Sequence, residues 1–286
     1  MKGIVLAGGV GSRLWPITLG VSKQLLPIYD KPLVYYPIST LMLAQIREIL
    51  VITTPKDQEA FQRILGDGSR YGIRFEYAVQ EYPSGIAQAF QVGEKFIGCD
   101  SVALILGDNI FYGHNLNVEL PGNSTISGAH IFAYLVKDPQ RYGVVEIDPN
   151  GSIKSLQEKP IIPKSAYAVT GLYFYDNEVV SFSKKLQPSR RGELEITDIN
   201  NMYLKKGRLK VTVLPRGTVW LDTGTFESLS AASSYIQIIE ERQGQKISCL
   251  EEIAWRNKWI NDDQLVQAAD SYQSSPFADY LRSLLN

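Results

Sequence analysis

A chain of 286 residues, 44% of them hydrophobic and 21% charged, is long enough to bury a sizeable core and has an ordinary globular composition. Its 29 basic and 30 acidic residues leave a net charge of −1, so we expect no nucleic acid and no membrane surface as a partner, because both require a concentrated positive field. Two cysteines and two histidines provide too few ligands for the usual zinc sites. With no leader peptide and no apolar run of membrane length, we expect a cytoplasmic protein.

The first third alternates apolar runs of strand length with segments of helical period. The predicted strands span 4–6, 49–53, 75–79 and 102–106, and the predicted helices span 37–47, a segment opened by Thr54 and Pro55, and 86–96. Strands this apolar, separated by helices, predict a mostly parallel sheet covered on both faces.

The middle of the chain is richer in strands, and the end is helical. Strands are predicted over 130–136, 142–147, 152–157, 167–175, 209–214 and 218–221, with a helix over 177–186. From there we expect an α/β core over residues 1–225 and a helical C-terminal section over 226–286.

A glycine-rich turn follows the first strand. Gly8, Gly9 and Gly11 precede Arg13, so backbone N–H groups and a guanidinium could face one anion. Leu14 stands where the dinucleotide fingerprint needs its third glycine, and the Gly-Lys-Ser/Thr of the P-loop is absent. An anion-binding turn and a tight turn with a surface arginine therefore both remain open.

Other charged residues stand where a nucleotide site would need them. Lys23 lies close enough along the chain to share a triphosphate with the glycine turn. Glu158 and Lys159 end a predicted strand on opposite faces, so they are not paired with each other, and a solvated strand end is the alternative reading.

Two aspartates come directly after predicted strands. Asp108 follows 102–106 and Asp222 follows 218–221, and ligands of open α/β sheets bind beyond the carboxyl ends of strands. Two such carboxylates could share one Mg²⁺. Each alone could instead be a turn-forming aspartate beside glycine.

Taken in order, these segments resemble one family, the bacterial sugar-1-phosphate nucleotidylyltransferases, and within it the glucose-1-phosphate thymidylyltransferases. The resemblance covers nearly the whole chain. Its motifs are LAGGVGSRL at 6–14, SKQLLPIYDKP at 22–32, LGDNIF at 106–111, RYGVVE at 141–146, EKP at 158–160, AVTGLYFY at 168–175, RGELEITD at 191–198 and WLDTGT at 220–225.

The resemblance implies a Rossmann-like nucleotidyltransferase fold and a Mg²⁺-dependent reaction of dTTP with glucose 1-phosphate, giving dTDP-glucose and pyrophosphate. This would be the first step towards a dTDP-deoxysugar such as dTDP-rhamnose. It divides the core into a nucleotide half over about 1–110 and a sugar-phosphate half over about 111–225. It also implies a homotetramer, a dimer of dimers, with dTDP-rhamnose as feedback ligand.

The same resemblance assigns roles to individual residues. The catalytic residues would be Arg13, Lys23 and Lys159, and the metal ligands Asp108 and Asp222. Nucleotide contacts would come from Gly8, Gly11, Gln24, Gln80, Gly85 and Asp108. Sugar-phosphate contacts would come from Tyr142, Gly143, Glu158, Lys159, Val169 and Arg191. Weaker candidates for an allosteric site in the helical tail are His114, Ile253 and Arg256.

Two alternatives differ from this reading. One is a uridylyl- or cytidylyltransferase of the same fold, because Pro83 and Ser84 stand before Gly85 where relatives commonly carry an aspartate. The other is a non-catalytic sensor of nucleotide sugars. Retention of Arg13 and both aspartates favours an enzyme over the sensor.

Overall fold

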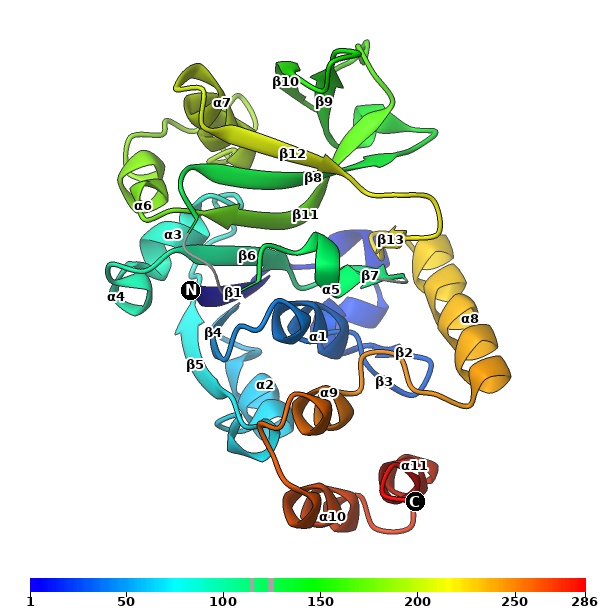
Figure 1. Ribbon diagram of the computed structural model, residues 1–286. Coiled ribbons are helices and arrows are strands. Elements are labelled where there is room, and N and C mark those ends of the chain that lie inside the picture. The colour runs from blue at the N-terminus through cyan, green and yellow to red at the C-terminus, as the bar shows by residue number, and fades with distance from the viewer. Residues whose placement is uncertain (114–115, 123–125) are drawn as a thin grey trace.

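The computed structural model describes residues 1–113, 116–122 and 126–286. Its strands are β1 (Lys2–Ala7), β2 (Pro27–Ile28), β3 (Lys31–Pro32), β4 (Glu48–Thr53), β5 (Arg74–Val79), β6 (Val102–Leu106), β7 (Asn109–Tyr112), β8 (Ala129–Leu135), β9 (Gly143–Ile147), β10 (Ile153–Glu158), β11 (Tyr167–Tyr175), β12 (Leu209–Val213) and β13 (Val219–Asp222). Nine of these described strands form one sheet, and β13-β7 and β2-β3 form two small ones (Figure 1).

Helices surround this sheet. The α-helices are α1 (Tyr35–Leu43), α2 (Gln58–Leu65), α3 (Gln88–Val92), α4 (Glu94–Ile97), α5 (Leu116–Glu119), α6 (Glu178–Ser183), α7 (Ile196–Lys205), α8 (Phe226–Gln243), α9 (Leu250–Arg256), α10 (Asp262–Ser271) and α11 (Pro276–Ser283). Single 3₁₀ turns are η1 (Ser12–Leu14), η2 (Ile17–Leu19), η3 (Lys23–Leu25), η4 (Ser69–Tyr71) and η5 (Pro139–Arg141).

The predicted α/β fold with a mostly parallel central sheet is confirmed. β1 pairs in parallel with β4 on one side and β6 on the other, and β5 extends the parallel ladder from β4. β11 then runs antiparallel to β6 and carries β8 and β9, while β12 is parallel to β8. In the large sheet, the antiparallel pairings all involve β9, β10 or β11, which lie after residue 142.

The sheet buries apolar side chains on both faces, as its continuous apolar strands require. Val5 and Ala7 belong to a cluster that includes side chains of α1 and α9, whereas Ile4 and Leu6 belong to a second cluster with α3 and α6. This follows from the alternation of successive side chains along a strand.

Some predicted helix boundaries are wrong. α1 ends at Leu43 because the chain turns at Gln45, whose φ of 62° is left-handed, before β4 begins. Thr54 donates a hydrogen bond to the Asp57 carboxylate at 2.5 Å, so a turn precedes α2. The helix predicted over 86–96 is divided at Gly93, a residue with low helix propensity.

After residue 225 the elements are helices, in agreement with the predicted helical section. Thr225 caps α8 through a reciprocal pair of hydrogen bonds with Ser228. Leu250, Leu265 and Leu281 are fully buried in the same cluster as β1. The division at residue 225 itself stays a prediction.

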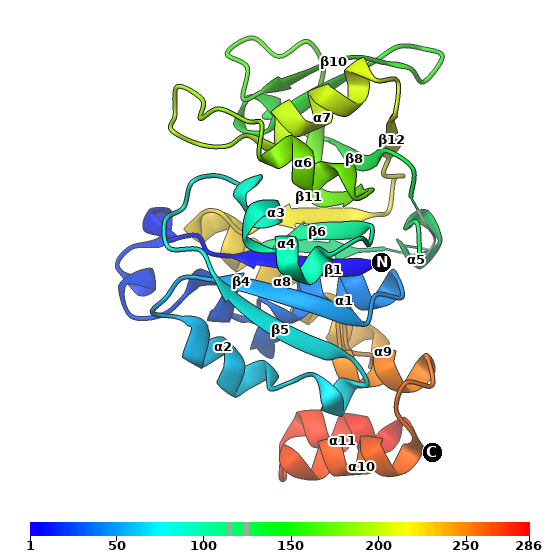
Figure 2. The ribbon, with the colours of Figure 1, turned by 90° about the vertical axis from the view of Figure 1, so that its left-hand side faces the viewer.

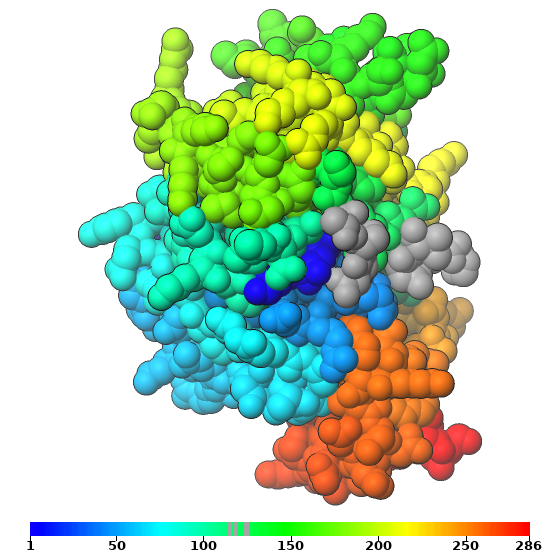
Figure 3. Space-filling view, turned by 60° about the vertical axis from the view of Figure 1, so that its left-hand side comes forward, coloured from blue at the N-terminus to red at the C-terminus, as the bar shows by residue number. Residues whose placement is uncertain are grey.

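α10 and α11 lie at the end of the molecule opposite to β9 and β10 in two perpendicular views (Figures 1 and 2). A space-filling view shows the C-terminal residues packed against the first hundred (Figure 3). Within the described ranges, no helix is both long and apolar enough to cross a membrane.

His130 on β8 introduces a pH dependence into the fold. Its ring is 7% exposed, stacks on Phe132 at 4.8 Å and lies 2.8 Å from the Thr212 hydroxyl. Burial, together with the charge of Lys210, lowers the pKa of His130 from 6.5 to about 4. The folded protein therefore resists a proton that the unfolded chain accepts.

We predict that this histidine costs stability as the pH falls from about 6.5 towards 4, and that its effect is absent above that window. His130→Gln should lose less unfolding free energy than the wild type between about pH 7 and pH 4.5, by on the order of 2 kcal/mol. Urea denaturation of both proteins across this range measures the difference. If the unfolding free energies of the two proteins fall in parallel with pH, the prediction is wrong.

Candidate active site

A cavity of about 380 Å³ opens beyond the carboxyl ends of β6 and β13. It is bordered by η1, β10, β11 and α7, so segments from both predicted halves of the core meet there. Predicted residues that line it are Arg13, Asp108, Tyr142, Gly143, Glu158, Lys159, Val169 and Asp222. The sequence-based prediction of a crevice at strand ends is consistent with this placement.

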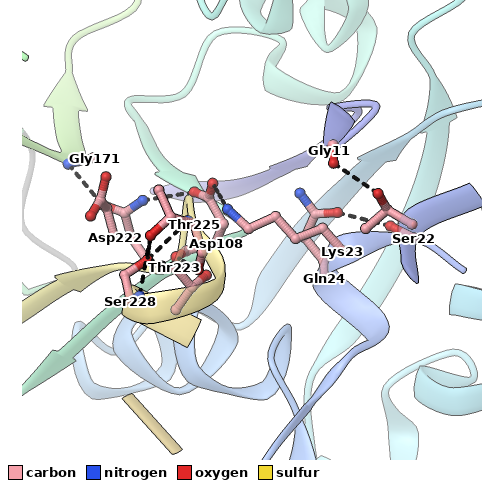
Figure 4. Close-up of polar contacts among 12 residues, drawn as sticks. Gly11, Ser22, Lys23, Gln24, Asp108, Gly171, Asp222, Thr223, Thr225 and Ser228 are labelled. Atoms are coloured by element: carbon pink, nitrogen blue, oxygen red, sulfur yellow. Dashed lines mark hydrogen bonds and ion pairs between the residues drawn. The ribbon is translucent and has the colours of Figure 1, made fainter. Parts of the chain in front are cut away.

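Asp108 is held by an ion pair. The ammonium of Lys23 on η3 lies 2.6 Å from Asp108 Oδ2, and Lys23 is itself only 6% exposed (Figure 4). Burial acts to raise the pKa of the Asp108 carboxyl, but the charge and hydrogen bond of Lys23 and a hydrogen bond from Asn109 outweigh it and lower the pKa. Asp108 therefore stays ionised.

Asp222 reaches the cavity through β13. In the antiparallel β13-β7 ladder Asp222 is the partner of Asn109, so the two aspartates lie next to each other across the two strands. Thr223 strengthens this junction by donating from its backbone N–H and its hydroxyl to the carbonyl of Asp108, at 3.2 and 3.0 Å. Two distant segments of the sequence thus bring their carboxylates together.

The environment of Asp222 differs from that of Asp108. Arg141 donates to Asp222 Oδ2 at 3.3 Å, from a side chain also bound to Asp138 at 2.8 Å. Burial is the largest cause that raises the pKa of Asp222, and the negative charge of Asp108 adds to it, while Arg141 offsets only part. Asp222 is thus a carboxylate short of positive charge.

Asn109 connects three strands around the cavity. Its side-chain oxygen accepts hydrogen bonds from the Trp220 indole at 2.6 Å and from the backbone N–H of Gly171 at 3.2 Å. Its amide nitrogen donates to Asp108 at 2.8 Å. Because Asn109 is only 3% exposed, these bonds hold β7, β11 and β13 in fixed relation.

Arg13 is exposed on η1 at the edge of the cavity. Arg13 and Asp222 both lie close to Gly224, since a Cβ at Gly224 would be 3.4 Å from the guanidinium and 3.5 Å from the carboxylate. In the described part of the chain Arg13 has no ion-pair partner. Its charge is available to an anion.

Glu158 and Arg191 form a second polar group at the cavity. Thr197 donates to Glu158 Oε2 at 2.6 Å, and Arg191 lies 3.3 Å from Oε1. A hydrogen bond with Glu195 at 2.7 Å is the largest cause that raises the pKa of Arg191, with nearby carboxylates adding to it. Arg191 borders Glu158 without lining the cavity itself.

Lys159 has an unusual backbone conformation. Its φ of 40° is in the left-handed region, which costs a non-glycine residue about 1 kcal/mol. Its backbone N–H donates to the Tyr142 carbonyl at 3.0 Å. Its nearly half-exposed ammonium lies 3.9 Å from Glu158 Oε1, so the expectation that these two side chains are not paired is wrong, because the left-handed backbone at Lys159 breaks the alternation of the strand. Local strain at a cavity residue suggests a functional reason for its position.

Apart from Asp108, the predicted nucleotide residues do not line this cavity; they are Gly8, Gly11, Gln24, Gln80 and Gly85. Gly85 has φ of 104°, and a Cβ there would come within 2.5 Å of the Leu194 carbonyl, so only glycine fits. Gly11 accepts a hydrogen bond from Thr18 at 2.8 Å, and Gln24 accepts one from Ser22 at 2.8 Å. The loop carrying Lys23 is thereby ordered.

The weaker allosteric candidates lie elsewhere. Ile253 and Arg256 line a separate cavity of about 230 Å³ between α1, β7 and α9. His114 lies outside the described residues, although Gly113 beside it lines the same cavity.

The arrangement is suited to Mg²⁺, because Asp108 and Asp222 are adjacent and a divalent cation would relieve their repulsion. No group of three or more potential metal-binding side chains occurs in the described ranges, so phosphate oxygens and water would have to complete the coordination. Mg²⁺ commonly binds through one or two carboxylates and substrate phosphates.

Sequence reasoning assigned no role to several residues that line the cavity, among them the polar side chains of Asn109, Arg141, Thr197 and Trp220. Each lies within a motif that carried the family resemblance, one or a few positions from an assigned residue. Adjacency to Asp108, Tyr142 or Asp222 was the available signal, but the contacts that give these side chains a role are tertiary.

Known proteins match this chain over its whole length. The family model described as nucleotidyl transferase matches residues 2–238. A glucose-1-phosphate thymidylyltransferase of Mycolicibacterium smegmatis is 58% identical over 286 residues, and one of Neisseria meningitidis is 57% identical over 286 residues. Each alignment covers 100% of this chain and 99% of the relative.

A solved structure shows the same similarity. A crystal structure from Bacillus anthracis, assigned as a glucose-1-phosphate thymidylyltransferase in complex with sucrose, is 45% identical to this chain. It superposes with a TM-score of 0.75 and covers 82% of this chain and 94% of its own.

We predict that Asn109→Ala lowers the free energy of unfolding by more than about 2 kcal/mol. The substitution leaves two buried donors, the Trp220 indole and the Gly171 backbone N–H, without an acceptor, and each costs roughly 1–3 kcal/mol. Chemical denaturation measures the loss. In a Trp220→Phe background, where one of the two donors is already gone, the same substitution should cost less. An equal loss in both backgrounds would show that the Trp220 bond contributes nothing.

Proposed function

This chain belongs to the glucose-1-phosphate thymidylyltransferase family of nucleotidyl transferases, and on that premise we propose that it transfers dTMP from dTTP to glucose 1-phosphate. The products are dTDP-glucose and pyrophosphate. One observation carries the proposal: three cationic side chains from separate segments and three carboxylates line one cavity, the cations being Arg13, Arg141 and Lys159. Such a set suits two phosphorylated substrates.

In the proposed reaction a phosphate oxygen of glucose 1-phosphate attacks the α-phosphorus of dTTP. A new P–O bond forms there, the bond from the α-phosphorus to the α–β bridging oxygen breaks, and pyrophosphate carries away the electron pair. This chemistry needs positioning and charge neutralisation rather than a protein nucleophile. In keeping with that, no cysteine or histidine of the described residues lines the cavity.

In this proposal, different cationic residues bind the phosphates of the two substrates. Arg13, which has no ion-pair partner among the described residues, binds the triphosphate and stabilises charge at the α-phosphate. Lys159 and Arg191 bind the phosphate of the sugar substrate. Lys23 acts through Asp108, since the 2.6 Å ion pair holds that carboxylate in place.

The polar group at β10 provides a place for the sugar. Glu158 has carboxylate oxygens to accept hydrogen bonds from sugar hydroxyls, and Thr197 orients it. Tyr142, Gly143 and Val169 complete this side of the cavity.

Mg²⁺ is part of the proposal, held by Asp108 and Asp222. When bound, it neutralises phosphate charge and orients the reacting phosphates. The burial of Asp222 and its repulsion by Asp108 support this assignment. Feedback by dTDP-rhamnose, the homotetramer, supply of a deoxysugar pathway and cytoplasmic location stay predictions that rest on the resemblance.

The proposal predicts a clear ranking of nucleotides. With glucose 1-phosphate and Mg²⁺, dTTP should have a kcat/KM at least about tenfold above those of CTP, ATP and GTP, with formation of dTDP-glucose and pyrophosphate measured directly. A preference for UTP or CTP would identify a uridylyl- or cytidylyltransferase instead. Binding of nucleotide sugars without any turnover would identify a sensor.

The metal assignment predicts that Asp108→Asn and Asp222→Asn each reduce turnover at least about 100-fold. Asp138→Asn is the matched control, because Asp138 contacts the same arginine as Asp222 but does not line the cavity. It should keep nearly full activity. Steady-state rates over a range of Mg²⁺ concentrations give the comparison, and full activity in both cavity variants would overturn the metal site.

A further inference from the structure

The amide of Gln80 is held at the end of β5 in one orientation. Gln80 is 4% exposed, and its backbone N–H donates to the Thr53 carbonyl at 2.8 Å. Its side-chain nitrogen Nε2 donates to Gln88 Oε1 at 2.6 Å and to the backbone carbonyl of Gly85 at 3.3 Å. Both N–H bonds of this amide are therefore used.

The carbonyl of Gly85 determines which end of the amide is nitrogen. A backbone carbonyl can only accept hydrogen bonds, so the atom of Gln80 that faces Gly85 must be the donor. The bond to Gln88 is shorter by 0.7 Å, which makes Gln88 the stronger of the two restraints.

The oxygen of the same amide is left for a ligand. Gln80 Oε1 accepts no hydrogen bond from the described residues. It lies over the backbone of Gly8 in the glycine-rich turn, where a Cβ would come within 2.5 Å of it. Glycine at this position gives the oxygen its space.

We propose that Gln88 is a positioning residue that selects the nucleobase by holding the amide oxygen of Gln80 towards it. This rests on the proposed function and on the nucleotide contact that the family resemblance assigns to Gln80, which we take to be a contact with the base. A fixed acceptor requires a donor on the base. Thymine and uracil carry N3–H, whereas N3 of cytosine is an acceptor, so the fixed amide favours dTTP and UTP and disfavours dCTP.

Gln88 is half-buried on α3 and does not line the cavity, so its effect on nucleotide choice passes through Gln80. If the acceptor at position 88 is lost, only the longer bond to Gly85 opposes rotation of the amide. The reversed amide presents NH₂, which pairs with N3 of cytosine and opposes N3–H of thymine. Selectivity between the two bases should fall, whereas a purely structural defect would reduce turnover of both alike.

The test measures kcat/KM for dTTP, UTP and dCTP with glucose 1-phosphate in single variants. Gln88→Met removes the acceptor at similar size and should narrow the dTTP-to-dCTP ratio at least about fivefold, with UTP following dTTP. Gln88→Glu keeps an acceptor for Gln80 Nε2 and should keep the ratio. Gln91→Met on the same helix is the matched control, because Gln91 donates to Ser183 at 2.7 Å, away from Gln80, and it too should keep the ratio.

An unchanged ratio in Gln88→Met, with dTTP still used by the wild type, would overturn the positioning role and leave the proposed function standing. Absence of thymidylyl transfer by the wild type would instead defeat the proposed function. If Gln88→Met does not fold, Gln88→Lys provides the same decision, because an ammonium only donates and should turn the oxygen of Gln80 towards itself. That variant should shift the ratio towards dCTP, and an unchanged ratio there would likewise overturn the role.

Discussion

Two carboxylates placed next to each other beyond the end of β6 impose the main electrostatic constraint on this structure. Asp108 and Asp222 are brought together by the β13-β7 ladder, and each is paired with one cation, Lys23 and Arg141. The compensation is unequal, because Asp108 keeps a lowered pKa while that of Asp222 is raised. In the proposed function, the carboxylate left short of positive charge would receive a cation together with its phosphate ligands.

The supporting structure keeps this pair in position. Asn109 connects strands that are far apart in the sequence, since its partners are Gly171 and Trp220. Around it, cations come from two separate 3₁₀ turns, η1 and η5, and from the end of β10, so no single element builds the site. Charge neutralisation by converging segments is suited to phosphoryl chemistry, in which positioning and electrostatic stabilisation do most of the catalytic work.

Much of the fold was predictable from the sequence because its cause is local. Alternation along β1 places Val5 and Ile4 in different cores, and the apolar runs that follow predict parallel strands buried on both faces. The predicted helix boundaries were wrong where the chain turns or the helix is interrupted, as at Gln45 and Gly93. The pairing of β7 with β13 joins segments about 110 residues apart, and no periodic pattern reports such a pairing.

By itself the sequence determined the alternation of strands and helices, the position of each aspartate after a strand, and the family, through motifs that hold residues in a fixed order. Only the tertiary structure decided that Lys23 forms an ion pair with Asp108, that Arg141 forms one with Asp222, and that Gln88 accepts a hydrogen bond from the amide of Gln80. The reason is physical. Strand and helix patterns follow from the burial period of neighbouring residues, whereas ion pairs and hydrogen bonds depend on distances between side chains that only the packed chain sets.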